Sequence, residues 1–144
     1  MKILTLQQRR CILNVSKIVT TNMEESIMKN YSKTTVAQND RTELHDILSL
    51  TGAEVSLNSL PAGANVPFVH AHKNNEEIYG ILSGKGKVVI DGETVELNAG
   101  DWLRIAPAAH RQFFAAADAP ISFVCIQVRA GSLEGYTMTD AVVL

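Results

Sequence analysis

The chain has 144 residues, of which 46% are hydrophobic and 19% are charged, a composition that is ordinary for a single folded domain. Its formal net charge of −2 at pH 7 argues against an obligate nucleic-acid or anionic-membrane partner, so we expect neither. No apolar run approaches the roughly 20 residues that cross a bilayer.

The two cysteines have no spacing that is typical of a metal or redox site. Cys125 lies in the apolar run 121–128, where we expect a buried, reduced thiol. A disulfide with Cys11 would have to join a core strand to the N-terminal segment. We therefore expect a reducing compartment and a cytoplasmic protein.

The N-terminal segment differs in charge from the rest of the chain. Residues 1–22 carry four basic side chains and no acidic one. A capping residue at 21 or 22 precedes two glutamates, which favours a short helix around residues 22–30. We expect residues 1–30 to be a poorly ordered extension. A mitochondrial presequence, or upstream sequence read from an early start codon, are the alternatives.

From residue 53 onward, short apolar runs alternate with turn residues. The runs that we expect to be strands are 53–60, 66–72, 76–82, 87–90, 94–97, 102–106, 110–114 and 121–128. A turn is expected at Ser83–Gly86, and Asp91-Gly92 predicts a type I′ hairpin. Strands at this spacing, with no convincing helix among them, indicate an all-β sandwich or barrel.

The flanking segments are less patterned. Residues 36–50 would contain an edge strand and a turn, and His45 within them matches no motif. The tail after Arg129 would either add a last edge strand or pack across the barrel.

Three of the four histidines lie in these runs, close to a carboxylate. Side chains two apart in a strand share a face, so His70 and His72 can reach one point. Glu77 lies in the next run, and His110 lies in a later one. Three imidazole nitrogens and a carboxylate suit a first-row divalent metal. Without a metal, each buried group left unpaired would cost about 1–3 kcal/mol.

These residues resemble the two motifs of the cupin superfamily. The first motif reads Gly, five residues, His-x-His, three or four residues, Glu, six residues, Gly. The second reads Gly, five residues, Pro-x-Gly, two residues, His, three residues, Asn. The corresponding residues here are Gly63, His70, His72, Glu77 and Gly84 in the first motif, and Gly100, Pro107 and His110 in the second.

The chain departs from these motifs only at turn positions. The interval after each leading glycine is six residues rather than five. The segment Pro107–His110 is shorter than the family's, and Phe114 stands in place of the asparagine. Because the glycines and the asparagine shape turns, we expect all four metal positions to be filled. The match spans residues 53–129 and leaves the first 50 unexplained.

The resemblance implies a fold and a ligand set. It implies an all-β jelly roll, or double-stranded β-helix barrel, over residues 31–144 with a short irregular or helical N-terminal extension. One divalent transition metal (Fe, Mn, Ni, Co or Zn) would be held by His70, His72, Glu77 and His110. The family's spacing to Gly84 is what selects Glu77 rather than Glu76.

Strand alternation then suggests which side chains surround the metal. Tyr79 shares a face with Glu77, and Gln112 shares one with His110, so both are candidate catalytic residues lining the pocket. Phe68, Ile81 and Phe114 would either line the same pocket or pack in the core.

Resemblance to cupins implies metal-dependent chemistry on a small oxygenated organic molecule, with a dioxygenase-like enzyme as the first reading. The alternatives are a non-catalytic small-molecule-binding or sensor cupin, and a cupin isomerase. We expect a homodimer, paired through the residues before Gly52, because an open jelly roll leaves strand edges that must be covered.

Overall fold

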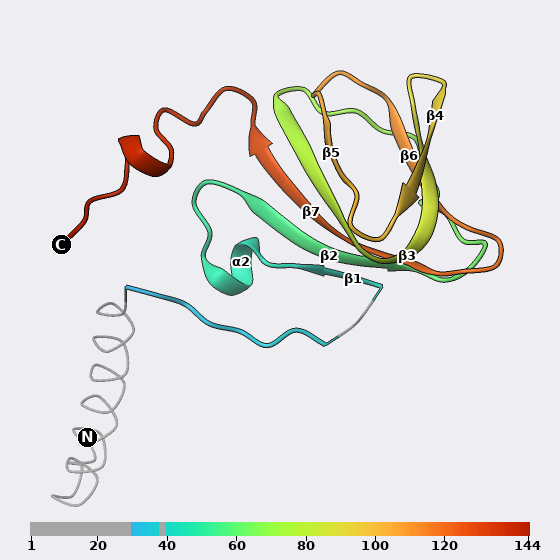
Figure 1. Ribbon diagram of the computed structural model, residues 1–144, viewed down its shortest axis with the longest axis horizontal. Helices are drawn as coiled ribbons and strands as arrows, with labels where there is room; N and C mark the ends of the chain where they lie inside the picture. Colours follow the sequence, from blue (N-terminus) through green and yellow to red (C-terminus); the bar gives the residue numbers. More distant parts are fainter. Residues whose placement is uncertain (1–29, 38–39) are drawn as a thin grey trace, which may run out of the picture. The chain divides into compact units, whose positions relative to one another are not determined.

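The computed structural model describes residues 30–37 and 40–144 (Figure 1). Residues 34–144 form one compact unit. The helix expected near residues 22–30, and nearly all of the expected N-terminal extension, lie outside the described residues. None of the helices in the described part of the chain has the length and apolar character needed to span a bilayer.

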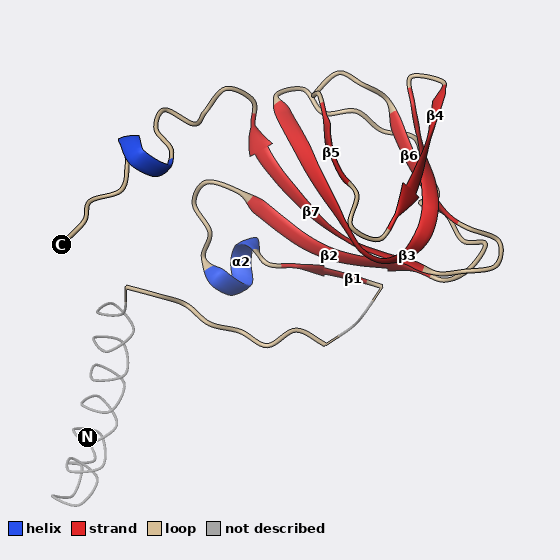
Figure 2. Ribbon diagram, viewed as in Figure 1, coloured by secondary structure: helices blue, strands red, loops and turns tan. Residues whose placement is uncertain are grey.

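Nearly all regular structure in this unit is β-strand (Figure 2). The strands are β1 (Arg41–Glu43), β2 (Glu54–Leu60), β3 (Asn75–Ile90), β4 (Glu93–Asn98), β5 (Trp102–Ile105), β6 (Arg111–Ala115) and β7 (Ile121–Arg129). The helical elements are α2 (His45–Leu48) and the 3₁₀ turn η1 (Thr137–Thr139). The predicted all-β class is confirmed, and β1 is the edge strand expected within residues 36–50.

The long strand β3 connects the two parts of the sheet (Figure 1). Its first part pairs antiparallel with β7 on one side and β5 on the other. Its second part pairs antiparallel with β4 and β6. Strands β2 and β1 extend the sheet beyond β7, so that the order is β1-β2-β7-β3. A single strand therefore carries residues into both halves of the barrel.

The turn predicted at Ser83–Gly86 is wrong, because β3 continues through these residues without a break. A register shift between Ile81 and Ser83 bends the strand instead. Gly84 has φ +76°, and a Cβ there would overlap the carbonyl oxygen of Pro120. A Cβ on Gly86 would likewise overlap the carbonyl oxygen of Phe114. These glycines thus permit close approach of neighbouring strands rather than a chain reversal.

Two other local predictions have opposite outcomes. The Asp91-Gly92 hairpin is confirmed: both residues have positive φ, 50° and 89°, and Ile90 faces Glu93 directly across it. The strand predicted over 66–72 is wrong. That segment is irregular, and one isolated bridge within it pairs His70 with Arg111 of β6.

The core is built from side chains of both halves of the sheet. Its buried hydrophobic members are Tyr79, Ile81, Val88, Leu97, Ile105, Phe113, Ala115, Ile121, Phe123 and Cys125. The rings of Tyr79, Phe113 and Phe123 pack together with centroids 4.4 to 5.8 Å apart; Phe113 and Phe123 are stacked, and Tyr79 is tilted against both. As predicted, the thiol of Cys125 is free and buried.

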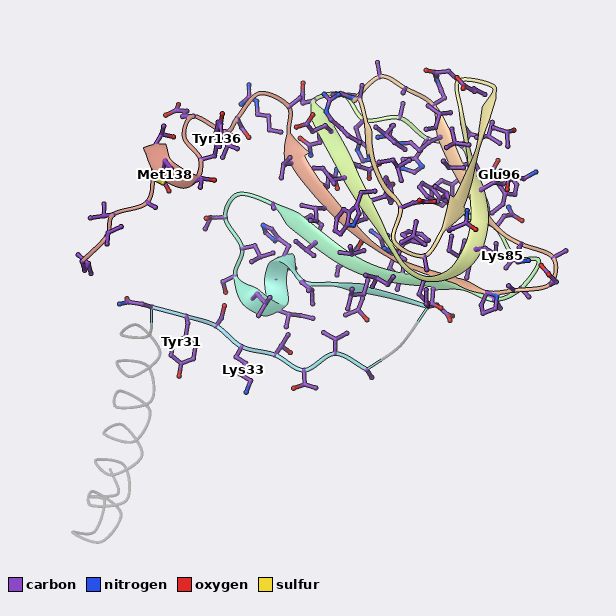
Figure 3. The ribbon with its side chains drawn as sticks, viewed as in Figure 1. Tyr31, Lys33, Lys85, Glu96, Tyr136 and Met138 are labelled. Atoms are coloured by element: carbon purple, nitrogen blue, oxygen red, sulfur yellow. The ribbon has the colours of Figure 1, made fainter. Side chains whose placement is uncertain are left out.

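The C-terminal tail forms no edge strand, so that alternative is wrong. It contains only η1, and Tyr136 and Met138 are 70% and 87% exposed (Figure 3). Exposed side chains of this kind contribute little apolar burial, so the core is complete without them.

Replacing Gly84 with alanine should cost about 2 kcal/mol or more of unfolding free energy, because positive φ and the collision with Pro120 act together. Gly63→Ala has positive φ but open space, and should cost about 1 kcal/mol. Gly52→Ala has neither and should stay within about 0.5 kcal/mol of wild type. Urea unfolding of the three variants measures this order, and equal costs at residues 84 and 63 would contradict it.

Candidate functional site

Three of the predicted ligands come together at one point. One ring nitrogen each of His70 and His72 and a carboxylate oxygen of Glu77 all lie within 4.8 Å of one another. Glu77 lies in β3 between β5 and β7 and is 5% exposed. The two histidines lie on the irregular segment before β3, and their rings meet edge to face at 5.3 Å.

The carboxylate of Glu77 is bonded on both oxygens. Oε2 accepts hydrogen bonds from the Tyr79 hydroxyl at 2.8 Å and from Nε of Arg111 at 2.9 Å. Oε1 lies 3.0 Å from Nε2 of His72 and 3.6 Å from the thiol sulfur of Cys125. Four side chains from different parts of the barrel therefore fix the position of this group.

The sequence-based reasoning missed Arg111 as a site residue. Its side chain is completely buried. Nη1 donates to the carbonyl oxygens of Ala109 at 2.6 Å and Pro107 at 3.2 Å. Nη2 lies 2.9 Å from Oε2 of Glu77, an ion-pair contact without hydrogen-bond alignment. The sequence did contain an indication: Arg111 lies inside a predicted strand, and an arginine that faces inward is almost always paired with a carboxylate.

His110 is not brought to this cluster, which corrects its assignment as the fourth ligand. Its side chain is 71% exposed, and its Nδ1 lies 3.5 Å from Oδ1 of Asp91. The backbone N–H of His110 also donates to that oxygen. Strand β6 begins at the next residue, Arg111, which faces His70 across the bridge. Alternation along the strand therefore turns Arg111, not His110, toward Glu77.

Of the two candidate catalytic residues, Tyr79 faces the cluster and Gln112 does not, because Gln112 shares the face of His110 on β6. Tyr79 is 4% exposed and bonded to Glu77, as its parity predicted. Gln112 lies on the other parity of β6, and its Nε2 donates to the carbonyl of Val66. Phe113 takes the inward position instead and packs against the ring of Tyr79 at a tilt of 34°. Gln112 is therefore not among the residues that line the cavity beside Glu77.

The three other side chains that were expected in the pocket or the core lie in different surroundings. Ile81 is part of the buried core. Phe68 is 58% exposed, and its ring meets that of His70 edge to face at 5.6 Å. Phe114 lies under the ammonium of Lys87, 5.5 Å from its centroid, on the opposite face of β6 from Phe113.

Electrostatics fix the protonation of the site at neutral pH. Burial would raise the pKa of Glu77, but the hydrogen bond from Tyr79 and the charge of Arg111 outweigh it and lower the pKa. Burial lowers the pKa of His70, which favours the neutral imidazole that can bind a metal. Burial also raises the pKa of the Tyr79 hydroxyl and raises that of the Cys125 thiol to about 12. Both groups are therefore protonated.

The donor set fits a metal held by three protein ligands. The buried Nδ1 of His70 has no hydrogen-bond partner among the described residues, and Nδ1 of His72 lies 3.0 Å from the side-chain amide of Gln127. An imidazole that binds a metal through Nε2 carries its proton on Nδ1 and needs an acceptor there. Gln127 supplies one when its amide oxygen, rather than the nitrogen, faces the ring. Arg111 offers no lone pair, so it cannot act as a fourth ligand.

The cluster opens on a cavity of about 530 Å³. Its apolar wall includes Leu60, Val66, Phe68, Phe113 and Phe123. Its polar wall includes Asp40, Arg41, Glu43, Asn58 and Gln127 in addition to His70, His72, Glu77 and Tyr79. A concave, mostly apolar space with a few convergent polar groups is the usual form of a small-molecule site.

Replacing Arg111 with methionine should destabilise the fold by about 3–5 kcal/mol at pH 7, because it leaves the buried carboxylate of Glu77 without its cation. Burial would then raise the pKa of Glu77 above its usual 4.5, so protonation at about pH 4.5 should reduce the deficit.

Urea unfolding at both pH values measures the difference from wild type. Arg104→Met, which removes an ion pair with Glu76 from a half-exposed arginine, should cost less than about 1 kcal/mol at either pH. An equal deficit for Arg111→Met at both pH values would show lost packing rather than an unpaired charge.

The fold and site have relatives among known proteins. Residues 56–127, half of the chain, match the Cupin_2 family, the cupin domain. Protein MJ1618 of Methanocaldococcus jannaschii is 32% identical over 66 residues, which are 46% of this chain and 52% of that protein. The chain thus aligns with about half the length of this curated relative.

Among solved structures, a cupin protein (BF4112) from Bacteroides fragilis is 74% identical, with a TM-score of 0.80 over 81% of this chain and 99% of that one. A sugar phosphate isomerase of the cupin superfamily from Silicibacter pomeroyi is 25% identical, with a TM-score of 0.55 over 63% of this chain and 60% of that one. From its matched domain, its β-barrel and these likenesses, the chain belongs to the cupin family.

Proposed function

We propose that this cupin is a metal-dependent enzyme that acts on a small oxygenated organic molecule, with dioxygenase-like chemistry as the leading candidate. The observation that carries the proposal is the convergence of His70, His72 and Glu77 beside a cavity of about 530 Å³. Two histidines and one carboxylate with open positions are the donor set of non-haem iron(II) oxygenases. Fe, Mn, Ni, Co and Zn all suit such donors, so the metal's identity stays part of the proposal.

The side chains of the site would divide the work. His70, His72 and Glu77 would hold the metal. Tyr79 and Arg111 would orient the carboxylate of Glu77 through their hydrogen bonds to Oε2. When bound, the metal would polarise a substrate oxygen and, as iron(II), supply redox chemistry with dioxygen. Tyr79 stays protonated and keeps donating to Glu77, because burial raises its pKa.

The cavity wall would select and shield the substrate. The rings of Phe113 and Phe123 provide an apolar surface next to the cluster. Such a surface favours the carbon skeleton of a small molecule and keeps water away from the reacting groups. The partner that we propose is therefore a small organic ligand or substrate.

A cupin isomerase is the second candidate. It is favoured by the 25% identity to the Silicibacter pomeroyi structure described as a sugar phosphate isomerase. An isomerase would use the same cavity and turn over without consuming oxygen. A non-catalytic binding protein would return its ligand unchanged.

Two broader expectations stay predictions. The homodimer has support from β1, a three-residue strand that pairs only with β2 among the described strands and forms the sheet edge before Gly52. The cytoplasmic location has support from the free, buried thiol of Cys125.

Protein purified without chelator should carry close to one divalent transition metal per chain, measured by elemental analysis. Glu77→Ala and His72→Ala should each lower the metal content at least about tenfold, because each removes one of three ligands. His110→Ala is the matched control and should keep the wild-type content, since its side chain is exposed and outside the cluster. Wild-type protein that takes up none of the five metals would contradict the proposal.

The iron(II)-loaded protein should consume dissolved oxygen when a substrate is present. An oxygen-electrode screen against catechols, enols, β-diketones and thiols tests this, with Glu77→Gln as the inactive control. Uptake that needs both the substrate and Glu77 supports the dioxygenase reading. Product formation without oxygen uptake would favour the isomerase, and a ligand that raises the melting temperature and returns unchanged would favour a binding protein.

A further inference from the structure

Arg111 contacts the cluster from β6, the strand on which the sequence predicted the fourth ligand. The bridge between His70 and Arg111 is closed by two backbone hydrogen bonds, of 2.9 and 3.2 Å. Directly opposed residues of an antiparallel pair project to the same side. Both side chains therefore meet Glu77, which lies 4.0 Å from His70 and 2.9 Å from Arg111.

The guanidinium is held there independently of Glu77. Its Nη1 bonds to the carbonyls of Pro107 and Ala109, which belong to the turn just before β6. The side chain is fully buried, so it cannot swing out to solvent without opening this turn. A guanidinium remains charged at any pH at which the protein is folded.

This fixed cation changes the charge balance of the site. When both imidazoles are neutral, which is the form that binds a metal, Glu77 and Arg111 together carry no net charge. A divalent ion added to these groups would leave two positive charges in a largely buried space, close to a guanidinium that repels it. An anion bound beside the metal would offset that charge.

Building on the proposed metal site, we infer that Arg111 makes it a three-ligand centre that binds a divalent metal and a small anionic ligand cooperatively. The ligand class is a molecule whose metal-binding group is negatively charged, such as a carboxylate or an enolate. Neutral molecules of the same size would gain less from the excess positive charge. Arg111 is thus a positioning residue for Glu77 and a determinant of which substrates bind.

The coupling can be measured with cobalt(II), whose visible absorption reports its ligands, and with sodium azide as the anion. In wild-type protein, azide should tighten cobalt(II) binding by about tenfold, a usual size for coupling between two ligands. Dimethyl sulfoxide, a neutral oxygen donor, should have a much smaller effect. By reciprocity, cobalt(II) should tighten azide binding by the same factor.

Two variants separate the charge of Arg111 from its place in the fold. Arg111→Gln keeps hydrogen-bond donors but loses the charge, so it should bind cobalt(II) more tightly without azide and show little azide effect. Arg111→His adds a fourth nitrogen ligand and should bind cobalt(II) more tightly still. Circular dichroism and melting temperature confirm that each variant is folded.

The outcomes distinguish this inference from the proposed metal site. Cobalt(II) binding by wild type that azide leaves unchanged would overturn the coupling while keeping the metal site. Equal azide effects in wild type and folded Arg111→Gln would overturn the role of Arg111. If neither variant folds, the azide dependence of the wild type alone decides. Wild type that binds no cobalt(II) with or without azide would overturn both the metal site and the inference.

Discussion

The ion pair between Glu77 and Arg111 is the interaction on which the site depends. It joins β3 to β6 inside the barrel, where both side chains are almost completely removed from water. Loss of one partner would leave a buried charge, at a cost of about 3–5 kcal/mol, although such a pair adds little beyond what apolar residues would give. Stability alone therefore does not explain a charged pair here. Its specific effect is to hold Oε2 of the carboxylate and leave Oε1 facing His72.

The path of β3 makes this arrangement possible. Glu77 and Tyr79 lie in its first part, between β5 and β7, and its second part pairs with β6, which carries Arg111. The strand can serve both halves because Gly84 takes a positive φ at a point where Pro120 approaches its backbone. Small residues in the strand are therefore connected to the site, because they permit the close strand contacts beside the bend in β3.

Much of this could be predicted from the sequence, because strand alternation is local. The all-β class and the inward position of Tyr79 follow from residue type and period two, and the selection of Glu77 rests on its spacing to Gly84. Arg111 could not be found in this way, since a one-residue difference in where β6 begins exchanges its face with that of His110. That start is set by the bridge to His70, a contact between segments some 40 residues apart in the chain. Residue type favoured His110 as a ligand, whereas the long-range register decides the geometry.

The hydrogen bonds around Glu77 hold the site in place in the folded chain without a bound metal. Many metal sites are assembled by the metal, and their donors have no other partners in the folded chain. Here the carboxylate is already held by Tyr79 and Arg111, and His72 lies within hydrogen-bond distance of Gln127. Preorganised donors of this kind reduce the conformational cost of binding, while the charge of Arg111 raises the electrostatic cost. The two effects oppose each other for a bare cation and act together for a cation that arrives with an anion, so the same residues that stabilise the site also select its occupant.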